Sequence, residues 1–488
     1  MNSKFKIQNS GLLALLAALL FAAGCASTGP SPSAKAPAPS ERATLGMEGK
    51  PITRQLRKKL GLPANVSGVV AGDVIPGGPA ALAGVRPNDV VEQIGGANIL
   101  VDCDFLDAAF NRPSGPVDIV VRRRGSKLSL TLAAAGQDAL FAKACRAGVL
   151  AACFRQAWSL AGSRDAGDRA RSLELYESAC RAGSADACAY RGLFLSRDGD
   201  KASVAVLERA CDLGSGGGCA TLAFLHATGK FVPKDDRRAN ALYVKSCALG
   251  DEQGCYNEGL MADEGRGTGR DVSRAVARYR EGCDAGSAPA CTNLGFFYEH
   301  GTGVGKDAPK AAALYKRGCD GSRCQPSNRN GCVNLGRAYR DGTGIAKDPA
   351  RAAPLFRDAC DRDPDANDPG SEANRSRACS LLGALYIDGD GVEKDSSTAL
   401  RLSELGCERG DSFGCFNAAA ITGIGTERAA ASAAGFLEKA CDLGDGEGCF
   451  DLGVDYEKGR GVSPDRERAK GLFRKACQLG FREACGRK

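Results

Sequence analysis

The spacing of the cysteines constrains the fold of this chain more than any other feature of its sequence. Of the 23 cysteines in 488 residues, sixteen form eight pairs whose members lie eight residues apart. These pairs are Cys145/Cys153, Cys180/Cys188, Cys211/Cys219, Cys247/Cys255, Cys283/Cys291, Cys407/Cys415, Cys441/Cys449 and Cys477/Cys485. Two wider pairs, Cys319/Cys332 and Cys360/Cys379, fall in the same series. The second member recurs mostly every 31–36 residues, and a repeat of that length predicts a solenoid of stacked units.

A disulfide within each pair requires the chain to reverse between its two cysteines. Eight residues of one helix would separate the Cα atoms by about 12 Å, whereas a disulfide needs roughly 4.4–6.8 Å. In all eight regular pairs a glycine lies three residues after the first cysteine, which is typical of a left-handed helix C-cap. We therefore predict ten disulfides, each joining the last helix of one repeat to the first helix of the next. Each would contribute roughly 2–3 kcal/mol by restricting the unfolded chain.

Each repeat shows a helix–loop–helix pattern. Residues 291–300 and 306–319 space their apolar residues at helical intervals, and the glycine-rich loop Gly301-Thr-Gly-Val separates them. The loop returns as Gly342-Thr-Gly-Ile, Gly389-Asp-Gly-Val and Gly459-Arg-Gly-Val. This array resembles the cysteine-rich Sel-like repeats, which are relatives of tetratricopeptide repeats. The resemblance implies about nine repeats over residues 137–488, folded as an all-α, right-handed α/α superhelix whose concave face binds proteins or peptides.

The first 42 residues are predicted to target and tether the chain rather than to fold. Residues 1–6 are basic, and residues 11–23 form an apolar run too short to span a bilayer, which is typical of a signal peptide over residues 1–24. The small residues before Cys25 resemble a bacterial lipobox, which implies that Cys25 is acylated and anchors the protein to a membrane. Residues 25–42, rich in Pro, Ser and Ala, would be a flexible tether. Ala26 after Cys25 favours the outer membrane of a bacterial envelope, and cleavage to a free secreted protein is the alternative.

Residues 43–135 are predicted to form a small α+β domain. Short β-favouring runs at 68–73, 90–94, 117–123 and 127–132 are separated by turn signals, and helical stretches are expected at 80–83 and 105–111. About five strands and two helices in fewer than 100 residues suggest a partly open barrel. The predicted fold is therefore multidomain, with this domain followed by a disulfide-stapled all-α solenoid.

The segment from Gly68 to Ile94 resembles the PDZ domains of bacterial Deg/HtrA-type proteases. The resemblance implies that a peptide C-terminus adds as a strand beside Leu45, Gly46 and Met47, where Gly46 lets backbone N–H groups converge on the carboxylate. On the helix at 105–111, Phe105 and Ala109 share one stripe, which we expect to line the peptide groove. The alternative is a PDZ fold used only for docking or spacing.

An acidic insert between Cys360 and Cys379 holds the one candidate metal site. Five residues with oxygen-bearing side chains stand at the offsets 1, 3, 5, 7 and 12 of a calcium-binding loop. They are Asp361, Asp363, Asp365, Asn367 and Glu372. Ala366 replaces the glycine at offset 6, and Pro364 and Pro369 stiffen the loop, so a solvated acidic insert is the alternative. We expect no other cofactor.

The composition of the chain limits the classes of function that it can have. A net charge of +7 spread over 488 residues is not typical of nucleic-acid binding, and two histidines leave little scope for histidine-based catalysis. The favoured function is a non-enzymatic, extracytoplasmic scaffold that binds protein or peptide partners. One alternative is the penicillin-binding or weak β-lactamase activity ascribed to cysteine-rich repeat proteins, although Ser3–Lys6 in the leader is the one Ser-x-x-Lys and Lys-Thr-Gly is absent. The other alternative is a sensor of envelope stress. Cys103 and Cys324 stay unassigned.

Overall fold

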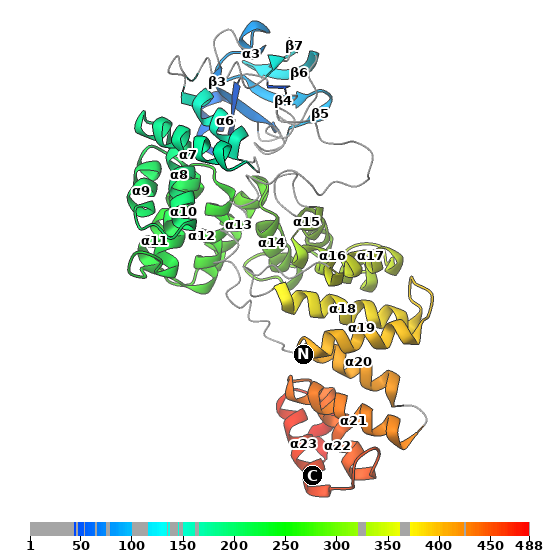
Figure 1. The fold of residues 1–488 in the computed structure, drawn as a ribbon. Coiled ribbons are helices and arrows are strands. Elements are labelled where there is room, and N and C mark those ends of the chain that lie inside the picture. Colours follow the sequence, from blue (N-terminus) through cyan, green and yellow to red (C-terminus); the bar gives the residue numbers. More distant parts are fainter. Residues whose placement is uncertain are drawn as a thin grey trace. The chain divides into compact units, whose positions relative to one another are not determined.

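The computed structural model describes residues 43–44, 47–52, 54–63, 66–74, 79–99, 116–133, 135–136, 145, 150–161, 165–320, 328–361, 371–423 and 426–487. They belong to two compact units, one formed by residues 43–305 and the other by residues 306–319 and 328–487. A small antiparallel sheet comes first in the chain and a series of helical hairpins follows (Figure 1).

The sheet has the strand order β2-β3-β4-β6-β7, and every neighbouring pair is antiparallel. Its strands are β2 (Met47–Pro51), β3 (Val69–Val74), β4 (Val90–Ile94), β6 (Pro116–Arg123) and β7 (Ser126–Ala133), and β5 (Ala97–Asn98) pairs with β4. β1 (Ala43–Thr44) and β8 (Ala135–Gly136) form a separate pair. The strands expected from the sequence match these bounds to within one residue. The described strands do not close into a barrel.

The core of this domain is built from apolar side chains that project from one face of the strands. Ile119 and Val121 on β6 are fully buried, and they pack with Val69, Val91 and other apolar residues of the neighbouring strands. Residues between them project to the opposite face, as the two-residue period of a strand requires. Two short helices, α2 (Arg54–Leu60) and α3 (Pro79–Leu82), accompany the sheet. The helix expected at 105–111 lies outside the described residues.

The rest of the chain alternates between two kinds of helix. Helices that begin a repeat, which we call helices A, are α6 (Leu150–Ala161), α8 (Ala185–Arg197), α10 (Gly216–Thr228), α12 (Glu252–Glu264), α14 (Ala288–His300), α16 (Arg329–Asp341), α18 (Ser371–Asp388), α20 (Ser412–Thr422) and α22 (Gly446–Lys458). Their partners, helices B, are α7 (Ala166–Arg181), α9 (Ser203–Asp212), α11 (Asp236–Ala248), α13 (Val272–Asp284), α15 (Ala308–Asp320), α17 (Pro349–Asp361), α19 (Ser396–Glu408), α21 (Glu427–Asp442) and α23 (Arg466–Gln478). A short 3₁₀ helix, η2 (Arg482–Gly486), follows α23.

In the first unit each helix from α6 to α13 packs against the next one along the chain, and in the second unit each helix from α16 to α22 does so (Figure 1). Helices A also pack on one another: α8, α10 and α12 form one layer in the first unit, and α16, α18 and α20 do so in the second. The array is thus a two-layered helical solenoid. Small residues permit this packing, since a Cβ added at Gly336 on α16 would meet the ring of Phe356 on α17 at 2.5 Å.

The reversals between repeats are built from matched caps. The glycine three residues after the first cysteine has a positive φ throughout the described series, from +88° at Gly410 to +102° at Gly286. In five of the regular pairs, a side chain four residues before the second cysteine then accepts a hydrogen bond from the first turn of the next helix, as Ser215 does from the N–H of Gly218 at 3.2 Å. The glycine ends helix B and the polar residue begins helix A, so the two cysteines meet across the turn.

The glycine-rich loop within each of these repeats contacts the preceding repeat. The second glycine of the loop lies against the start of helix B in the preceding repeat: a Cβ at Gly344 would come within 2.1 Å of the carbonyl oxygen of Ala308, and one at Gly461 within 2.2 Å of the carbonyl carbon of Ala430. The second glycine therefore has a packing role, whereas the first glycine, such as Gly342 or Gly459, ends helix A. This contact explains why the Gly-x-Gly pattern recurs with the repeat.

Candidate functional site

The described part of the predicted peptide-binding site is the edge strand β2. It has a hydrogen-bonded neighbour, β3, on one side, and it is the first strand of the sheet order. A register shift lies between Met47 and Gly49, and Met47 is buried in the core. Leu45, Gly46, Phe105 and Ala109 lie outside the described residues. The structure thus shows β2 at the edge of the sheet, and peptide binding by this edge, the loop and the helix stripe stays a prediction.

The structure bonds all ten expected cysteine pairs. Their Cα atoms are 4.4–4.9 Å apart, and each bond joins a helix B, or Cys145 ahead of α6, to the following element. Both cysteines of most pairs are buried, whereas Cys485 is exposed. Cys25, Cys103 and Cys324 lie outside the described residues. Ten disulfides are typical of proteins outside the cytoplasm.

The second cysteine of every pair except the last lies on helix A and is also a core residue. The buried second cysteines are Cys153, Cys188, Cys219, Cys255, Cys291, Cys332, Cys379, Cys415 and Cys449. In five of them Sγ lies close to the carbonyl oxygen of the first cysteine, at 3.5 Å for Cys188 and Cys332, 3.6 Å for Cys449 and 3.7 Å for Cys219 and Cys291. These are packing contacts, because an oxidised sulfur carries no proton to donate.

Most of the second cysteines are too deeply buried to contribute to a binding surface. As candidate site residues they are confirmed as disulfide partners, but Cys188, Cys219, Cys291, Cys332, Cys415 and Cys449 are at most 3% exposed and offer no surface to a ligand. The spacing of the cysteines predicts which ones are bonded, whereas their depth depends on how the neighbouring helices pack over them. Their role is therefore structural, and a binding surface must be built from other residues.

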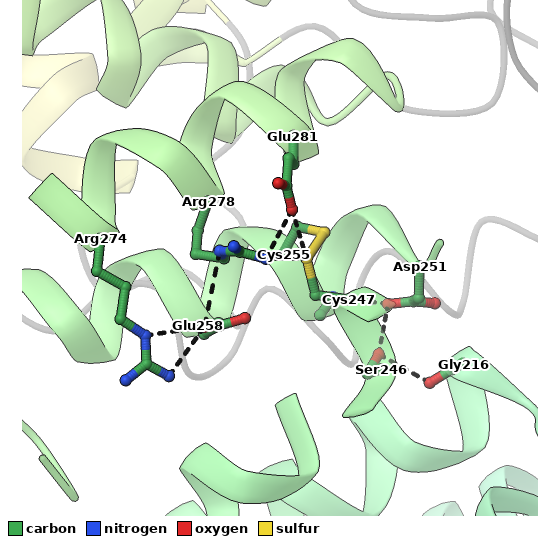
Figure 2. Close-up of a disulfide and its surroundings, with 10 residues drawn as sticks. Gly216, Ser246, Cys247, Asp251, Cys255, Glu258, Arg274, Arg278 and Glu281 are labelled. Atoms are coloured by element: carbon green, nitrogen blue, oxygen red, sulfur yellow. Dashed lines mark hydrogen bonds and ion pairs between the residues drawn. A yellow bond between two sulfur atoms is a disulfide. The ribbon is translucent and has the colours of Figure 1, made fainter. Parts of the chain in front are cut away.

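The disulfide between Cys247 and Cys255 lies beside two charged side chains (Figure 2). Glu281 on α13 places its Oε2 3.6 Å from Cys247 Sγ, and Arg278 places a guanidinium nitrogen 3.7 Å from the same sulfur. Arg278 and Glu281 are themselves paired at 2.7 Å. Cys247, Cys255 and Glu281 are close enough together to resemble a metal site. Because the two sulfurs are bonded to each other, they offer no thiolate ligand.

Next to this disulfide, a carboxylate occupies the core between α12 and α13. Glu258 is only 2% exposed, and its Oε1 accepts hydrogen bonds from Arg274 at 2.9 and 3.0 Å and lies 3.7 Å from Nε of Arg278 (Figure 2). Its second oxygen, Oε2, is buried with no hydrogen-bond partner, as is the side-chain amide nitrogen of Asn257. The two arginine side chains remain 30% and 27% exposed, so the cluster connects the core of this repeat to solvent.

Comparison of the repeats with one another would have revealed this cluster. The residue three positions after the second cysteine is leucine in five repeats: Leu222, Leu294, Leu335, Leu382 and Leu452. The matching position on helix B lies five residues before the first cysteine of a pair. It is apolar in every repeat except one, in which it is Arg278, five residues before Cys283. Glu258 and Arg278 therefore replace two apolar residues of the same helix pair. Sequence reasoning that concentrates on cysteines and glycines misses them.

A second electrostatic cluster lies on α22. Burial raises the pKa of Asp451 above its usual value, and the neighbouring carboxylate of Asp455 raises it further. Burial also raises the pKa of Asp455, which is partly offset by Arg460 at 2.8 Å. The pKa of Glu447 is raised by burial and then by Asp451. These carboxyl groups are therefore harder to ionise in the folded chain than in the unfolded chain.

The candidate calcium site is described at its two ends. Asp361 is exposed at the last position of α17. Glu372 lies in the first turn of α18 and forms an ion pair with Arg409 at 3.2 Å. Asp363, Asp365 and Asn367 lie outside the described residues.

Among the described residues, none of the helices combines the length and apolar composition needed to cross a membrane.

Comparison with known proteins identifies both parts of the chain. A PDZ domain model matches residues 68–123. A Sel1 repeat model matches 158–184, 218–251, 253–287, 288–322, 330–364, 376–411, 412–445 and 446–481, which together make up more than half of the chain. A search of the curated proteins found no match.

Several solved structures resemble the chain. A protective antigen with an SLR fold from uropathogenic Escherichia coli is 21% identical, with 70% of this chain and 80% of that chain covered and a TM-score of 0.46. The cysteine-rich protein B of Helicobacter pylori is 30% identical over 28% of this chain and 99% of its own, with a TM-score of 0.24. The HtrA-type protease AlgW, solved with a decapeptide, is 34% identical over 20% of this chain and 30% of its own, with a TM-score of 0.18. On the evidence of its matched repeats, the chain belongs to the Sel1 repeat family, and it carries a PDZ domain ahead of those repeats.

Proposed function

We propose that this protein is a non-enzymatic scaffold of the bacterial envelope that captures an extended peptide segment on its PDZ domain and holds a partner protein on its repeat array. PDZ domains and Sel1 repeats are generally protein-interaction modules. The observation that supports the proposal most directly is the position of β2 at the edge of the sheet. An edge strand offers unpaired backbone N–H and C=O groups to which an added strand can bond.

The repeat array supports the same role through its covalent reinforcement. A disulfide at each reversal between repeats limits how far neighbouring hairpins can move apart, and a rigid surface loses little conformational entropy when a partner binds. Two modules on one chain also raise the apparent affinity for a partner that engages both. Acylation of Cys25 would keep both modules at the outer membrane, and the mass of the mature N-terminal peptide tests that step.

The experiment measures peptide binding to the full chain after weakening the edge strand. Glu48 lies at the register shift of β2, where proline is tolerated in a sheet. Glu48→Pro removes one backbone N–H from the edge, and Glu48→Ala is the matched control that keeps it. Fluorescence anisotropy with a library of labelled C-terminal peptides, each also prepared as its amide, reports affinity and dependence on the free carboxylate.

We expect selected peptides to bind wild type and Glu48→Ala alike, and Glu48→Pro about tenfold more weakly, since one lost backbone hydrogen bond contributes about 1.4 kcal/mol. Amidated peptides should also bind more weakly. Equal binding of every peptide to the alanine and proline variants would contradict strand addition at β2. A library without any binder would leave the PDZ domain as a spacer and contradict the proposed capture.

A further inference from the structure

A row of positive charge crosses one face of the PDZ domain. Residues 50–59 contain five cationic residues and no acidic one. The helix α2 overlaps this stretch and ends at Leu60, and Leu56 and Leu60 on one side of it pack on Val70 and Val90 of the sheet. This packing fixes the helix on the sheet and leaves Lys58 and Lys59 exposed.

The sheet extends the same row. Val90, beneath α2, pairs with Arg122, and Arg122 in turn pairs with Lys127. Because paired residues of antiparallel strands project to the same face, Arg122 and Lys127 lie beside α2 rather than on the core side. Lys127 is 62% exposed. We call this surface the cationic face; it consists of Arg57, Lys58, Lys59, Arg122 and Lys127.

The partners of the cationic face leave it with excess positive charge. Glu92 pairs with Arg122 and, at 2.9 Å, with Lys127. Burial raises the pKa of Glu92, but the hydrogen bonds from Lys127 and Arg122 lower it more, so its pKa is below the usual value and it is ionised at neutral pH. The guanidinium of Arg57 donates hydrogen bonds to the carbonyl oxygens of Pro63 and Val66, which carry no net charge.

One further carboxylate lies on this face, Asp118, which accepts a hydrogen bond from Thr131 at 2.6 Å. It precedes Arg122 by four residues on β6 and therefore projects to the same side. Five cations against Glu92 and Asp118 leave a net charge of three on the described side chains of the face. Such a surface attracts a polyanion.

We propose that the cationic face docks on the anionic headgroups of the bilayer to which Cys25 is anchored, and this rests on the acylation included in the proposed function. β1 begins 18 residues after Cys25, and an extended chain of that length reaches at most about 60 Å, so the anchor keeps the face close to the membrane. A lipid chain and a basic surface together bind a membrane more stably than either alone. An acidic protein would have matching charge, but the bilayer is the one polyanion that the chain's own expected anchor holds near this face.

The test is lysine labelling of the full acylated chain reconstituted in vesicles. One set of vesicles is phosphatidylcholine, and the other contains about 30 mol% phosphatidylglycerol, which makes the surface anionic. An amine-reactive acetyl donor followed by mass spectrometry gives the modification rate of Lys58, Lys59 and Lys127. Lys439, exposed on α21 of the repeat array, is the internal control.

We expect acetylation of Lys58, Lys59 and Lys127 to slow about fivefold in anionic vesicles, with Lys439 unchanged, and to recover at an ionic strength of about 1 M, where the Debye length is about 3 Å. The variant K58E/K59E should label Lys127 equally in both vesicles, whereas K439E should behave as wild type. Equal labelling of wild type in the two lipids would overturn the proposal. Stronger protection by duplex DNA than by anionic vesicles at about 0.15 M salt would also overturn it.

A sedimentation assay separates failure of this proposal from failure of the anchor. If the chain does not incorporate into vesicles of either composition, acylation of Cys25 is contradicted. The same unincorporated chain, mixed with preformed anionic vesicles, should still sediment with them about fivefold more than K58E/K59E does, because the face acts without the anchor. Equal sedimentation of the two proteins would overturn docking by the cationic face.

Discussion

Glu258 and Arg278 replace an apolar contact with an ionic one inside a single repeat. Removing two charges from water costs more free energy than their attraction recovers unless the geometry is excellent. Here Oε1 of Glu258 makes all the described contacts with the arginines, and Oε2 is buried without a hydrogen-bond partner. We therefore infer that this pair lowers the stability of the α12–α13 hairpin compared with the leucines of the neighbouring repeats.

A set of variants at these positions tests that inference. Glu258→Ala leaves Arg274 and Arg278 without their anion and should lower the free energy of unfolding by about 2–3 kcal/mol, less than the roughly 3–5 kcal/mol of a fully buried pair because both arginines reach solvent. The double variant E258L/R278L restores the residues of the other repeats and should be at least as stable as wild type. Urea unfolding followed by circular dichroism measures both. A double variant as unstable as Glu258→Ala would show that the ionic pair is stabilising.

The raised pKa values on α22 predict how stability depends on pH. A carboxyl group whose pKa is higher in the folded chain binds more protons there than in the unfolded chain, so its contribution is complete below the usual pKa of about 3.9 and is lost as pH rises past the raised value. Asp451→Asn should therefore raise the melting temperature at pH 7 and make no difference near pH 3. Calorimetry at a series of pH values measures this.

Glu393→Gln, at an exposed loop carboxylate, is the control and should leave the melting temperature unchanged at every pH. A decrease in the melting temperature of Asp451→Asn at neutral pH would mean that the folded chain favours the charged form of Asp451, which is the opposite of what its burial beside Asp455 predicts.

At the scale of the elements, the reversals between repeats depend on glycine for its backbone conformation. Gly214 has φ +97° and nothing lies within 4 Å of an added Cβ, so Gly214→Ala isolates the backbone cost, which should be about 1–2 kcal/mol. Gly435 also has open space around its Cβ but lies inside α21, and Gly435→Ala should instead stabilise the chain by about 0.5–1 kcal/mol. Chemical unfolding measures both, and a loss of stability at both positions would contradict the role of the positive φ.

The elements also show what sequence reasoning could reach. The eight-residue spacing and its glycine predicted the reversals, because no single helix brings two such cysteines together. The β-favouring runs between turn signals predicted the strands, including the one that holds Ile119 and Val121. The packing role of Gly344 could not be predicted, since a glycine that ends a helix and a glycine pressed against the preceding repeat look alike in sequence. Glu258 required aligning the repeats with one another. The peptide groove remains a prediction, because Gly46 and Phe105 lie outside the described residues.

At the scale of the whole molecule, the disulfides are all local. Each closes a short loop, so each should stabilise its own junction and leave distant repeats unaffected, as in other repeat proteins whose units contact only their neighbours. The array thus gains rigidity at every junction without any long-range crosslink among its bonded pairs. This arrangement suits a surface on which a partner is held.

Removing one bond tests that locality. The variant C283A/C291A should lower the stability of the α13–α14 junction by about 2–3 kcal/mol, the entropy gained by the unfolded loop. Hydrogen exchange should speed up in α13 and α14 and remain as in wild type in α20 to α23. Faster exchange throughout the array would show that the repeats unfold as one cooperative block.

The stapled solenoid depends above all on covalent bonds between successive repeats, and peptide mapping of the unreduced, thiol-blocked protein by mass spectrometry tests them most directly. We expect ten linked peptides, each joining the two cysteines on either side of one reversal, from Cys145–Cys153 to Cys477–Cys485. Blocked thiols at these twenty cysteines, or links between distant repeats, would contradict the stapled solenoid and the scaffold built on it.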